Sequence, residues 1–234
     1  MTFANRTVVI TGAAGNLGRA VAKAFAELGA NLALVDLRQE SLARAFDAQN
    51  VRQLLLPADL MRQEELDAAV KKAAQRFERI DVLCNIAGGF RMGAPVHETS
   101  DADWNFLFDV NARSVLHAAR AVVPHMLKAG GGKIVNVGAY AANKGAARMG
   151  AYVASKSAVI RLTETMAAEL REKNINVNCV LPTIIDTPEN RADMPDADPR
   201  RWVAPQDLAA AIVFLASEDA RAIHGVALPV TGLS

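Results

Sequence analysis

Short apolar runs rich in β-branched residues alternate with segments whose apolar positions recur at the helical period, almost from end to end of the chain. This alternation predicts parallel strands joined by crossover helices, and therefore an α/β fold. The expected strands lie near residues 7–11, 31–36, 51–56, 80–84, 133–138, 175–181 and 226–230. The expected helices lie near residues 17–28, 39–48, 63–77, 101–128, 150–172 and 205–216.

Residues 182–205 depart from this pattern, because prolines interrupt them and charges of both signs are mixed among them. The segment is too polar and too often broken to form part of a core. Long loops at the carboxyl ends of parallel strands are usually functional. We therefore expect a lid over residues 182–205, in which the apolar Met194 and Trp202 close over a bound substrate.

The composition restricts the classes of partner. A length of 234 residues fits one domain, 1–234, and 51% hydrophobic residues is enough for a sizeable core. Twenty-six basic and 25 acidic residues leave a net charge of +1, which provides no strong field for nucleic acid or an anionic membrane. The longest apolar stretch, 208–216, is half a membrane span, and the N-terminus lacks a signal-peptide pattern. We expect a cytoplasmic protein that binds neither.

The cysteines and histidines do not indicate a disulfide or a metal site. Cys84 and Cys179 each fall inside a strand-like apolar run, which favours small buried thiols over a disulfide. The four histidines, at positions 97, 117, 125 and 224, lack metal-ligand spacing. We therefore expect no metal.

The first expected strand leads into the sequence TGAAGNLG over residues 11–18 and then into a helical segment. Gly12, Gly15 and Gly18 suit a loop where a side chain would collide with a diphosphate or where φ must be positive. Asn16 interrupts the glycines, but asparagine tolerates left-handed backbone geometry. Asp36 ends the second strand, where a carboxylate can accept hydrogen bonds from ribose hydroxyls. These features predict a dinucleotide site.

Tyr152 and Lys156 lie four residues apart, so one helix face carries a phenol and an ammonium. A phenol with a pKa of about 10 is a poor acid at neutral pH. An ammonium about 4 Å away favours the phenolate by roughly 4 kcal/mol at an effective dielectric near 20, while desolvation opposes this effect. A proton donor and a nucleotide site in one domain predict a redox enzyme.

These two motifs, their order and their separation resemble the short-chain dehydrogenase/reductase family. The resemblance implies a single doubly wound Rossmann domain with a seven-stranded, mainly parallel sheet in the order 3-2-1-4-5-6-7 and helices on both faces. It implies a dinucleotide half over residues 1–90 and a catalytic and substrate half over 91–234. It also implies NAD(P)-dependent hydride transfer to or from a small carbonyl, alcohol or conjugated compound, with Tyr152 as proton donor or acceptor.

Several further segments carry the resemblance. The sequence NIAG over residues 85–88 resembles the family's NNAG, Asn111 matches an asparagine that completes a proton relay, and residues 181–187 resemble the family's PGxxxT. Asp59 follows the third strand and by resemblance contacts adenine. The expected cofactor contacts are Gly12, Gly15, Asn16, Leu17, Gly18, Asp36, Leu37, Asp59, Leu60, Asn85, Ala87, Gly88, Tyr152, Lys156, Pro182, Ile185 and Thr187.

The sequence favours NAD(H) over NADP(H). A carboxylate at Asp36 would repel a 2′-phosphate, and neither Asn16 nor Leu37 supplies a cation to offset it. Arg38 is the nearby guanidinium that would have to swing over to reverse this preference.

Ala139 departs from the family pattern, because most members have a serine thirteen residues before the tyrosine to hold the substrate oxygen. Losing one donor to a developing oxyanion costs about 10²–10³ in rate. Either another group substitutes, with Tyr140 and Asn143 as the nearest polar candidates, or the substrate needs this donor less. We expect Ala139, Tyr140 and Trp202 to line the substrate pocket.

Residues 181–202 and 84–90 resemble dihydropteridine reductase, a branch that also lacks the serine and prefers NADH. Asn111 and the helical 101–128 region instead resemble mainstream oxidoreductases. The prediction is therefore an NAD-dependent oxidoreductase, with a quinonoid dihydropteridine reductase-like enzyme as an alternative. A non-catalytic NAD-binding sensor or structural protein is a further alternative, which Ala139 permits. Relatives assemble through helices corresponding to 101–128 and 150–172, so a homodimer or homotetramer is expected.

Overall fold

A computed structural model describes residues 1–46 and 50–234, and seven strands within them form one parallel sheet. Neighbouring strands are hydrogen-bonded in the order β3-β2-β1-β4-β5-β6-β7. The strands are β1 (Thr7–Thr11), β2 (Asn31–Asp36), β3 (Gln53–Pro57), β4 (Val82–Asn85), β5 (Gly132–Val137), β6 (Ile175–Pro182) and β7 (Ala227–Val230). The expected α/β fold and strand order are confirmed.

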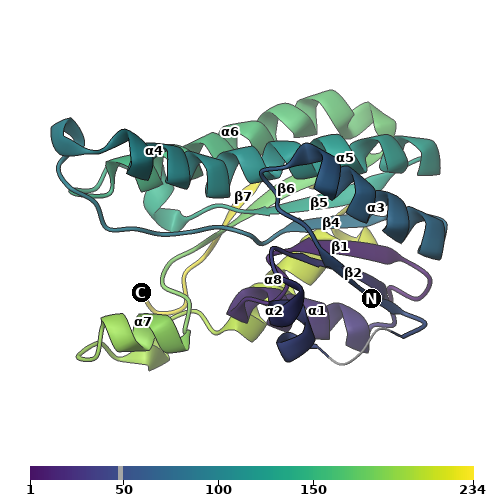
Figure 1. The fold of residues 1–234 in the computed structure, drawn as a ribbon, viewed down its shortest axis with the longest axis horizontal. Helices are drawn as coiled ribbons and strands as arrows, with labels where there is room; N and C mark the ends of the chain where they lie inside the picture. The colour runs from purple at the N-terminus through teal and green to yellow at the C-terminus, as the bar shows by residue number, and fades with distance from the viewer. Residues whose placement is uncertain (47–49) are drawn as a thin grey trace.

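Helices cover both faces of the sheet, with α1, α2 and α8 on one side and α3, α5 and α6 on the other (Figure 1). The helices are α1 (Asn16–Glu27), α2 (Gln39–Ala45), α3 (Gln63–Phe77), α4 (Asp101–Phe108), α5 (Ser114–Ala129), α6 (Gly150–Leu170), α7 (Pro188–Asp193) and α8 (Pro205–Leu215). The last two residues of the predicted helix 39–48 lie outside the described residues.

Successive residues of β1 point to opposite faces of the sheet, and both faces are buried. Val8 and Ile10 join the core cluster that includes α1 and α8, whereas Val9 joins the cluster that includes α3 and α5. Because neither face meets solvent, such a strand appears in the sequence as a continuous apolar run.

The predicted continuous helix over residues 101–128 is wrong in its middle. Between α4 and α5 a π-helical turn spans Asp109–Arg113. A π turn changes the spacing of side chains along the helix and is frequent at functional sites. Asn111 lies in this turn and is buried. The interruption therefore orients a residue that the sequence had singled out for the site.

Residues 182–205 contain α7 and a short 3-10 turn at Pro199–Arg201. Trp202 and Val203 are only 7% and 2% exposed, and Val203 pairs with Ile185 in a β-bridge. The expectation that the whole segment stays outside the core is therefore wrong at its C-terminal end. Trp202 is already packed against the body of the protein.

Cys84 and Cys179 are free and buried, as expected. Among residues 1–46 and 50–234, the structure brings no group of three or more His, Cys, Asp and Glu side chains together in a way that could hold a metal ion. Within the same residues, no helix is both long and apolar enough to span a membrane.

Candidate active site

The predicted site residues gather at the carboxyl edge of the sheet, and the loop from β1 to α1 forms one side of it. Gly12 has a φ of +64°, and a Cβ there would lie 2.8 Å from backbone atoms of Ala87. A Cβ on Gly18 would collide with the carbonyl oxygen of Gly12. At Gly15 the nearest atom would be 3.4 Å away. Packing within the loop therefore requires Gly12 and Gly18, while Gly15 has more room beside it.

The N-terminus of α1 has no side-chain cap. Gly15 is its N-cap residue and makes no capping hydrogen bond; α2, α3, α5, α6 and α8 also start without a side-chain cap, whereas Ser100 and Thr187 cap α4 and α7 with their hydroxyls. An uncapped helix start presents free N–H groups and a positive partial charge. These residues fit the diphosphate of a dinucleotide, because such groups bind phosphate without a cationic side chain.

Asn16 connects this helix start to α7. Its Nδ2 donates to Glu189 Oε2 at 2.7 Å, and its Oδ1 accepts from Arg19 Nη2 at 2.6 Å. Asn16 is the first residue of α1 and does not adopt a positive φ, so the left-handed geometry considered for it is wrong. The sequence did not indicate Glu189, because 173 positions separate it from Asn16.

Asp36 lies at the end of β2 and faces the same loop. Its Oδ2 accepts from the backbone N–H of Ala14 at 3.0 Å, and its Oδ1 accepts from that of Leu37 at 2.9 Å. Both carboxylate oxygens are thus oriented by the backbone. Arg38 is exposed beside it, and its side chain makes no contact among those described that would fix it near Asp36.

Asp59 follows β3, next to the end of β2, where the N–H of Ala58 donates to the carbonyl of Asp36 at 2.9 Å. The Asp59 carboxylate accepts from the backbone N–H of Met61 at 2.8 Å. The carbonyl of Leu60 accepts from His117 Nδ1 at 2.7 Å. The structure therefore places Asp59 and Leu60 near Asp36, and gives the Asp59 carboxylate a local turn-stabilising contact.

Asn85 ends β4 and belongs to a buried polar chain across the sheet. Its Nδ2 donates to Asn136 Oδ1 at 2.8 Å, and Asn136 Nδ2 donates to Thr163 Oγ1 at 2.8 Å. These contacts join β4, β5 and α6. The chain therefore links the end of β4 to the neighbouring strand and to the helix that carries Tyr152.

Asn111, Ser155 and Lys156 meet beside Gly88, close to Tyr152 on α6. Asn111 Nδ2 donates to Ser155 Oγ at 3.0 Å, and Lys156 Nζ donates to the carbonyl of Val137 at 2.8 Å. A Cβ added to Gly88 would lie 3.0 Å from Lys156 Nζ and 3.1 Å from Asn111 Oδ1. The glycine therefore allows a segment at the end of β4 to approach both polar groups.

The side chain of Asn111 also holds Gly89, because its Oδ1 accepts from the Gly89 N–H at 2.9 Å and its Nδ2 donates to the Gly89 carbonyl at 3.0 Å. Phe90 packs edge-on against the Tyr152 ring, with 4.9 Å between centroids. Gly89, Phe90 and Ser155 were not among the predicted site residues. Gly89 reaches this site through Asn111 of the π turn, a contact with no periodic signal in the sequence, whereas Ser155 lies one helical turn after Tyr152 and donates to its carbonyl at 2.8 Å.

Burial dominates the electrostatics of the pair on α6. Burial raises the pKa of Tyr152 to about 12 and lowers the pKa of Lys156 to about 8. The expected depression of the tyrosine pKa is therefore wrong, because desolvation of the phenolate raises this pKa instead. At neutral pH the phenol holds its proton, and the lysine is mostly an ammonium.

Ala139 is 4% exposed at the end of β5, whereas the following Tyr140 is 45% exposed. Pro182 ends β6, and the carbonyl of Ile185 accepts from Asn190 Nδ2 at 2.8 Å. Thr187 Oγ1 accepts from the Asn190 N–H at 3.2 Å as the cap of α7. The segment expected to contact the cofactor thus leads directly into α7, which contacts Asn16 through Glu189.

Comparison with known proteins agrees with this geometry. A family model for short chain dehydrogenases matches residues 6–198. The subunit BbsD of (2S)-[(R)-hydroxy(phenyl)methyl]succinyl-CoA dehydrogenase from Thauera aromatica is 34% identical, over 99% of this chain and 97% of the relative. D-threitol dehydrogenase from Mycolicibacterium smegmatis is also 34% identical, over 97% and 92%. Carveol dehydrogenase from Mycobacterium avium, solved in complex with NAD, is 30% identical with a TM-score of 0.89, over 98% and 97%.

Proposed function

This chain belongs to the short-chain dehydrogenase family, and we propose that it is an NAD-dependent oxidoreductase in which Tyr152 is the proton donor or acceptor. The substrate is a small carbonyl or alcohol, or a conjugated compound. The observation that carries the proposal is the meeting of Asn111, Ser155 and Lys156 at Gly88, beside Tyr152 and at the edge where α1 starts uncapped.

A bound nicotinamide would supply or accept the hydride, and the residues of this chain manage the accompanying proton. Tyr152, with its pKa raised to about 12 by burial, remains protonated at neutral pH and can donate to an oxygen that gains negative charge. Lys156, held on the Val137 carbonyl, supplies positive charge that stabilises the tyrosinate left behind. Asn111 and Ser155 are hydrogen-bonded to each other beside this pair, and Ser155 Oγ also donates to the backbone carbonyl of Tyr152 at 2.8 Å.

Asp36 supports NAD(H) rather than NADP(H), because backbone N–H groups hold its carboxylate where a 2′-phosphate would meet it. Titration of the purified chain with NADH and NADPH tests this preference. NADH should bind more tightly. Equal or tighter binding of NADPH would contradict the preference and indicate that Arg38 binds the 2′-phosphate.

A quinonoid dihydropteridine, or another conjugated acceptor, is the second candidate substrate. The buried, apolar Ala139 favours it, because such a compound stabilises its own charge on reduction and needs no hydroxyl at this position. The resemblance of residues 181–202 to dihydropteridine reductase supports the same candidate.

NADH oxidation assayed against simple ketones, quinones and quinonoid dihydropteridine separates these possibilities. Turnover with one class identifies the substrate type. Tight NADH binding without turnover on any of them would instead favour the non-catalytic NAD-binding alternative.

A homodimer or homotetramer is also proposed, through the helices at 101–129 and 150–170. Exposed apolar side chains on α4 and α5 support it, because an unpartnered apolar surface favours association. These side chains are Trp104, Phe106, Leu116 and Leu127. Light scattering of the purified chain tests the assembly, and a monomer would contradict it.

A further inference from the structure

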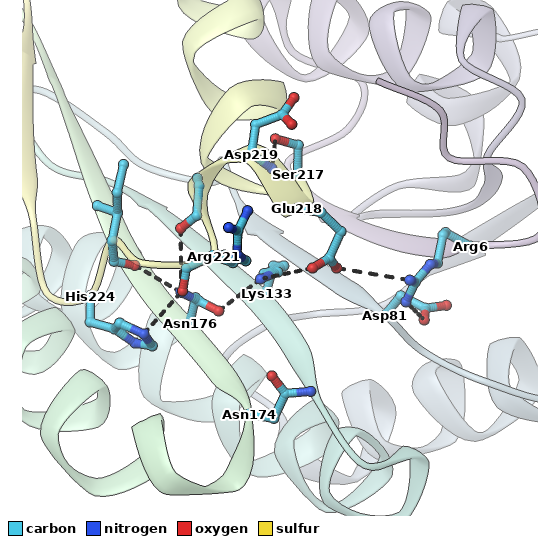
Figure 2. A network of polar contacts seen from close by, with 12 residues as sticks. Arg6, Asp81, Lys133, Asn174, Asn176, Ser217, Glu218, Asp219, Arg221 and His224 are labelled. Atoms are coloured by element: carbon cyan, nitrogen blue, oxygen red, sulfur yellow. Dashed lines mark hydrogen bonds and ion pairs between the residues drawn. The ribbon is translucent and has the colours of Figure 1, made fainter.

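The amino edge of the sheet, opposite the candidate active site, holds a cavity of about 330 Å³. Charged side chains surround it at the starts of β1, β4 and β5, together with the loop before β7 (Figure 2). The charged residues that line the cavity are Arg6, Arg79, Asp81, Lys133 and Glu218. Three cations therefore face two anions around this space.

Lys133 is the least satisfied of these groups. Its side chain is only 9% exposed, and Nζ donates to Asn176 Oδ1 at 2.8 Å. The nearest carboxylate oxygen, on Glu218, is 4.0 Å away, beyond hydrogen-bond distance. An ammonium has three donors, so a nearly buried one with a single acceptor is costly to the fold. Burial accordingly lowers the pKa of Lys133.

The two acidic residues differ in how firmly they are held. Asp81 is buried and accepts from Arg6 at 3.0 Å, from Arg79 at 2.8 Å and from the N–H of Thr7 at 2.9 Å. Glu218 is 69% exposed, and its oxygens stand 3.8 Å from Arg6 and 4.0 Å from Lys133. Asp81 is thus a fixed structural anion, whereas Glu218 bridges two cations loosely from the solvent side.

The ends of α5 and α8 also lie at this edge, and helix C-termini favour cations through their dipoles. This effect explains why basic residues gather here. Two of the last carbonyls of α5, those of Leu127 and Met126, already accept from the N–H groups of Gly130 and Gly131, and Lys133 Nζ donates only to Asn176 Oδ1 among the described contacts.

We propose that this cavity binds a phosphate group, with Lys133, Arg6 and Arg79 as its ligands and Glu218 as the side chain that it displaces. A phosphate dianion offers several acceptors at tetrahedral angles, so one group can serve an ammonium and two guanidiniums together. The cavity is larger than a phosphate ion, which leaves room for the organic part of a small phosphomonoester.

Thermal unfolding of the full chain tests the site, with inorganic phosphate or glycerol 3-phosphate replacing chloride at constant ionic strength. The melting temperature of the parent should rise with phosphate concentration and saturate. Lys133→Gln should lose this response, while Lys23→Gln, which removes an exposed lysine on α1, should retain it. Glu218→Gln should bind phosphate about two- to fivefold more tightly, since it removes a screened like charge.

Three results would overturn the proposal. The first is no stabilisation beyond that of chloride. The second is an unchanged response in Lys133→Gln, which would place the phosphate elsewhere, including the start of α1. The third is phosphate binding by Glu218→Gln that is no tighter than that of the parent. This measurement tests the site on its own if Lys133→Gln does not fold. If the site is supported, tighter binding of glycerol 3-phosphate than of phosphate indicates a phosphomonoester ligand, and the reverse indicates free phosphate.

Discussion

The two edges of this sheet are built from the same strands but carry different arrangements of charged and polar groups. At the carboxyl edge, α1 begins without a cap and two neighbouring polar side chains, Tyr152 and Lys156, have pKa values shifted by burial. At the amino edge, Asp81 is matched by two guanidiniums, and the helices there end rather than begin. Free N–H groups suit an anionic cofactor, whereas removing one partner of a buried ion pair such as that of Asp81 destabilises a fold. The difference predicts that substitutions at the carboxyl edge will change turnover or cofactor binding, whereas substitutions at the amino edge will change the free energy of unfolding.

The largest effect is expected from Tyr152→Phe. Loss of the transferable proton should reduce turnover by about 10²–10⁴-fold, while NADH binding and the free energy of unfolding change little. Steady-state kinetics at saturating NADH measure the loss of turnover, and an NADH titration measures cofactor binding separately. If the variant kept more than about a tenth of the parent activity, Tyr152 would not be the donor.

Ala139→Ser should have the next largest effect, and its sign depends on the substrate. With simple ketones the new hydroxyl should increase turnover, by up to about 10²–10³-fold and by less in a pocket not adapted to it. With a quinonoid or similarly conjugated compound it should be neutral or harmful. Measuring kcat/KM of parent and variant on both classes decides between them. Identical behaviour on both would show that residue 139 does not face the reacting oxygen.

Local patterns in the sequence predicted much of the carboxyl edge. Alternation of apolar runs and helical periods gave the strand and helix sequence, and the spacing of Tyr152 and Lys156 placed both on one helix. The π turn at Asp109–Arg113 was missed, because a change of one residue in helical spacing is invisible in a short amphipathic pattern. The raised pKa of Tyr152 was missed because it depends on burial by segments distant in sequence.

The contact of Asn16 with Glu189 and the cavity at Lys133 were missed for the same reason, because both depend on segments distant in sequence. Each joins segments that no local rule connects, across 173 positions in the first case and among five segments in the second. Charge counts over the whole chain, with a net value of +1, conceal both. Local sequence rules therefore describe the elements of a site better than the contacts between them.

Asp81→Asn should test the amino edge through stability. Asparagine keeps an acceptor for the Thr7 N–H but removes the anion from Arg79 and leaves Arg6 with only the distant carboxylate of Glu218. We expect the free energy of unfolding to fall by about 1–3 kcal/mol. Denaturant unfolding measures it, with the exposed Asp196→Asn as a matched control that should stay within about 0.5 kcal/mol of the parent. A loss no larger than that of the control would mean that Asp81 is not a structural anion.

Glu189→Gln should have the smallest effect. It tests the contact between Glu189 and Asn16 at the carboxyl edge, which the sequence did not predict. A hydrogen bond from its own backbone N–H, supported by Thr187 and Asn16, holds the pKa of Glu189 below its usual value, so the residue is charged at neutral pH. Asn16 places that carboxylate beside the start of α1, where the proposed diphosphate would bind. Glutamine keeps an acceptor for Asn16 but removes the repulsion, so the Kd for NADH should fall.

We expect a decrease of about two- to fivefold, since the carboxylate is exposed and screened, and the difference should shrink at high salt. Asp193→Asn provides the matched control, because it removes a carboxylate from the last residue of the same helix. An NADH titration of parent, variant and control at low and high salt gives the answer. Equal NADH affinities in all three proteins would mean that Glu189 does not repel the diphosphate. A parent that binds no dinucleotide would instead contradict the proposed function itself.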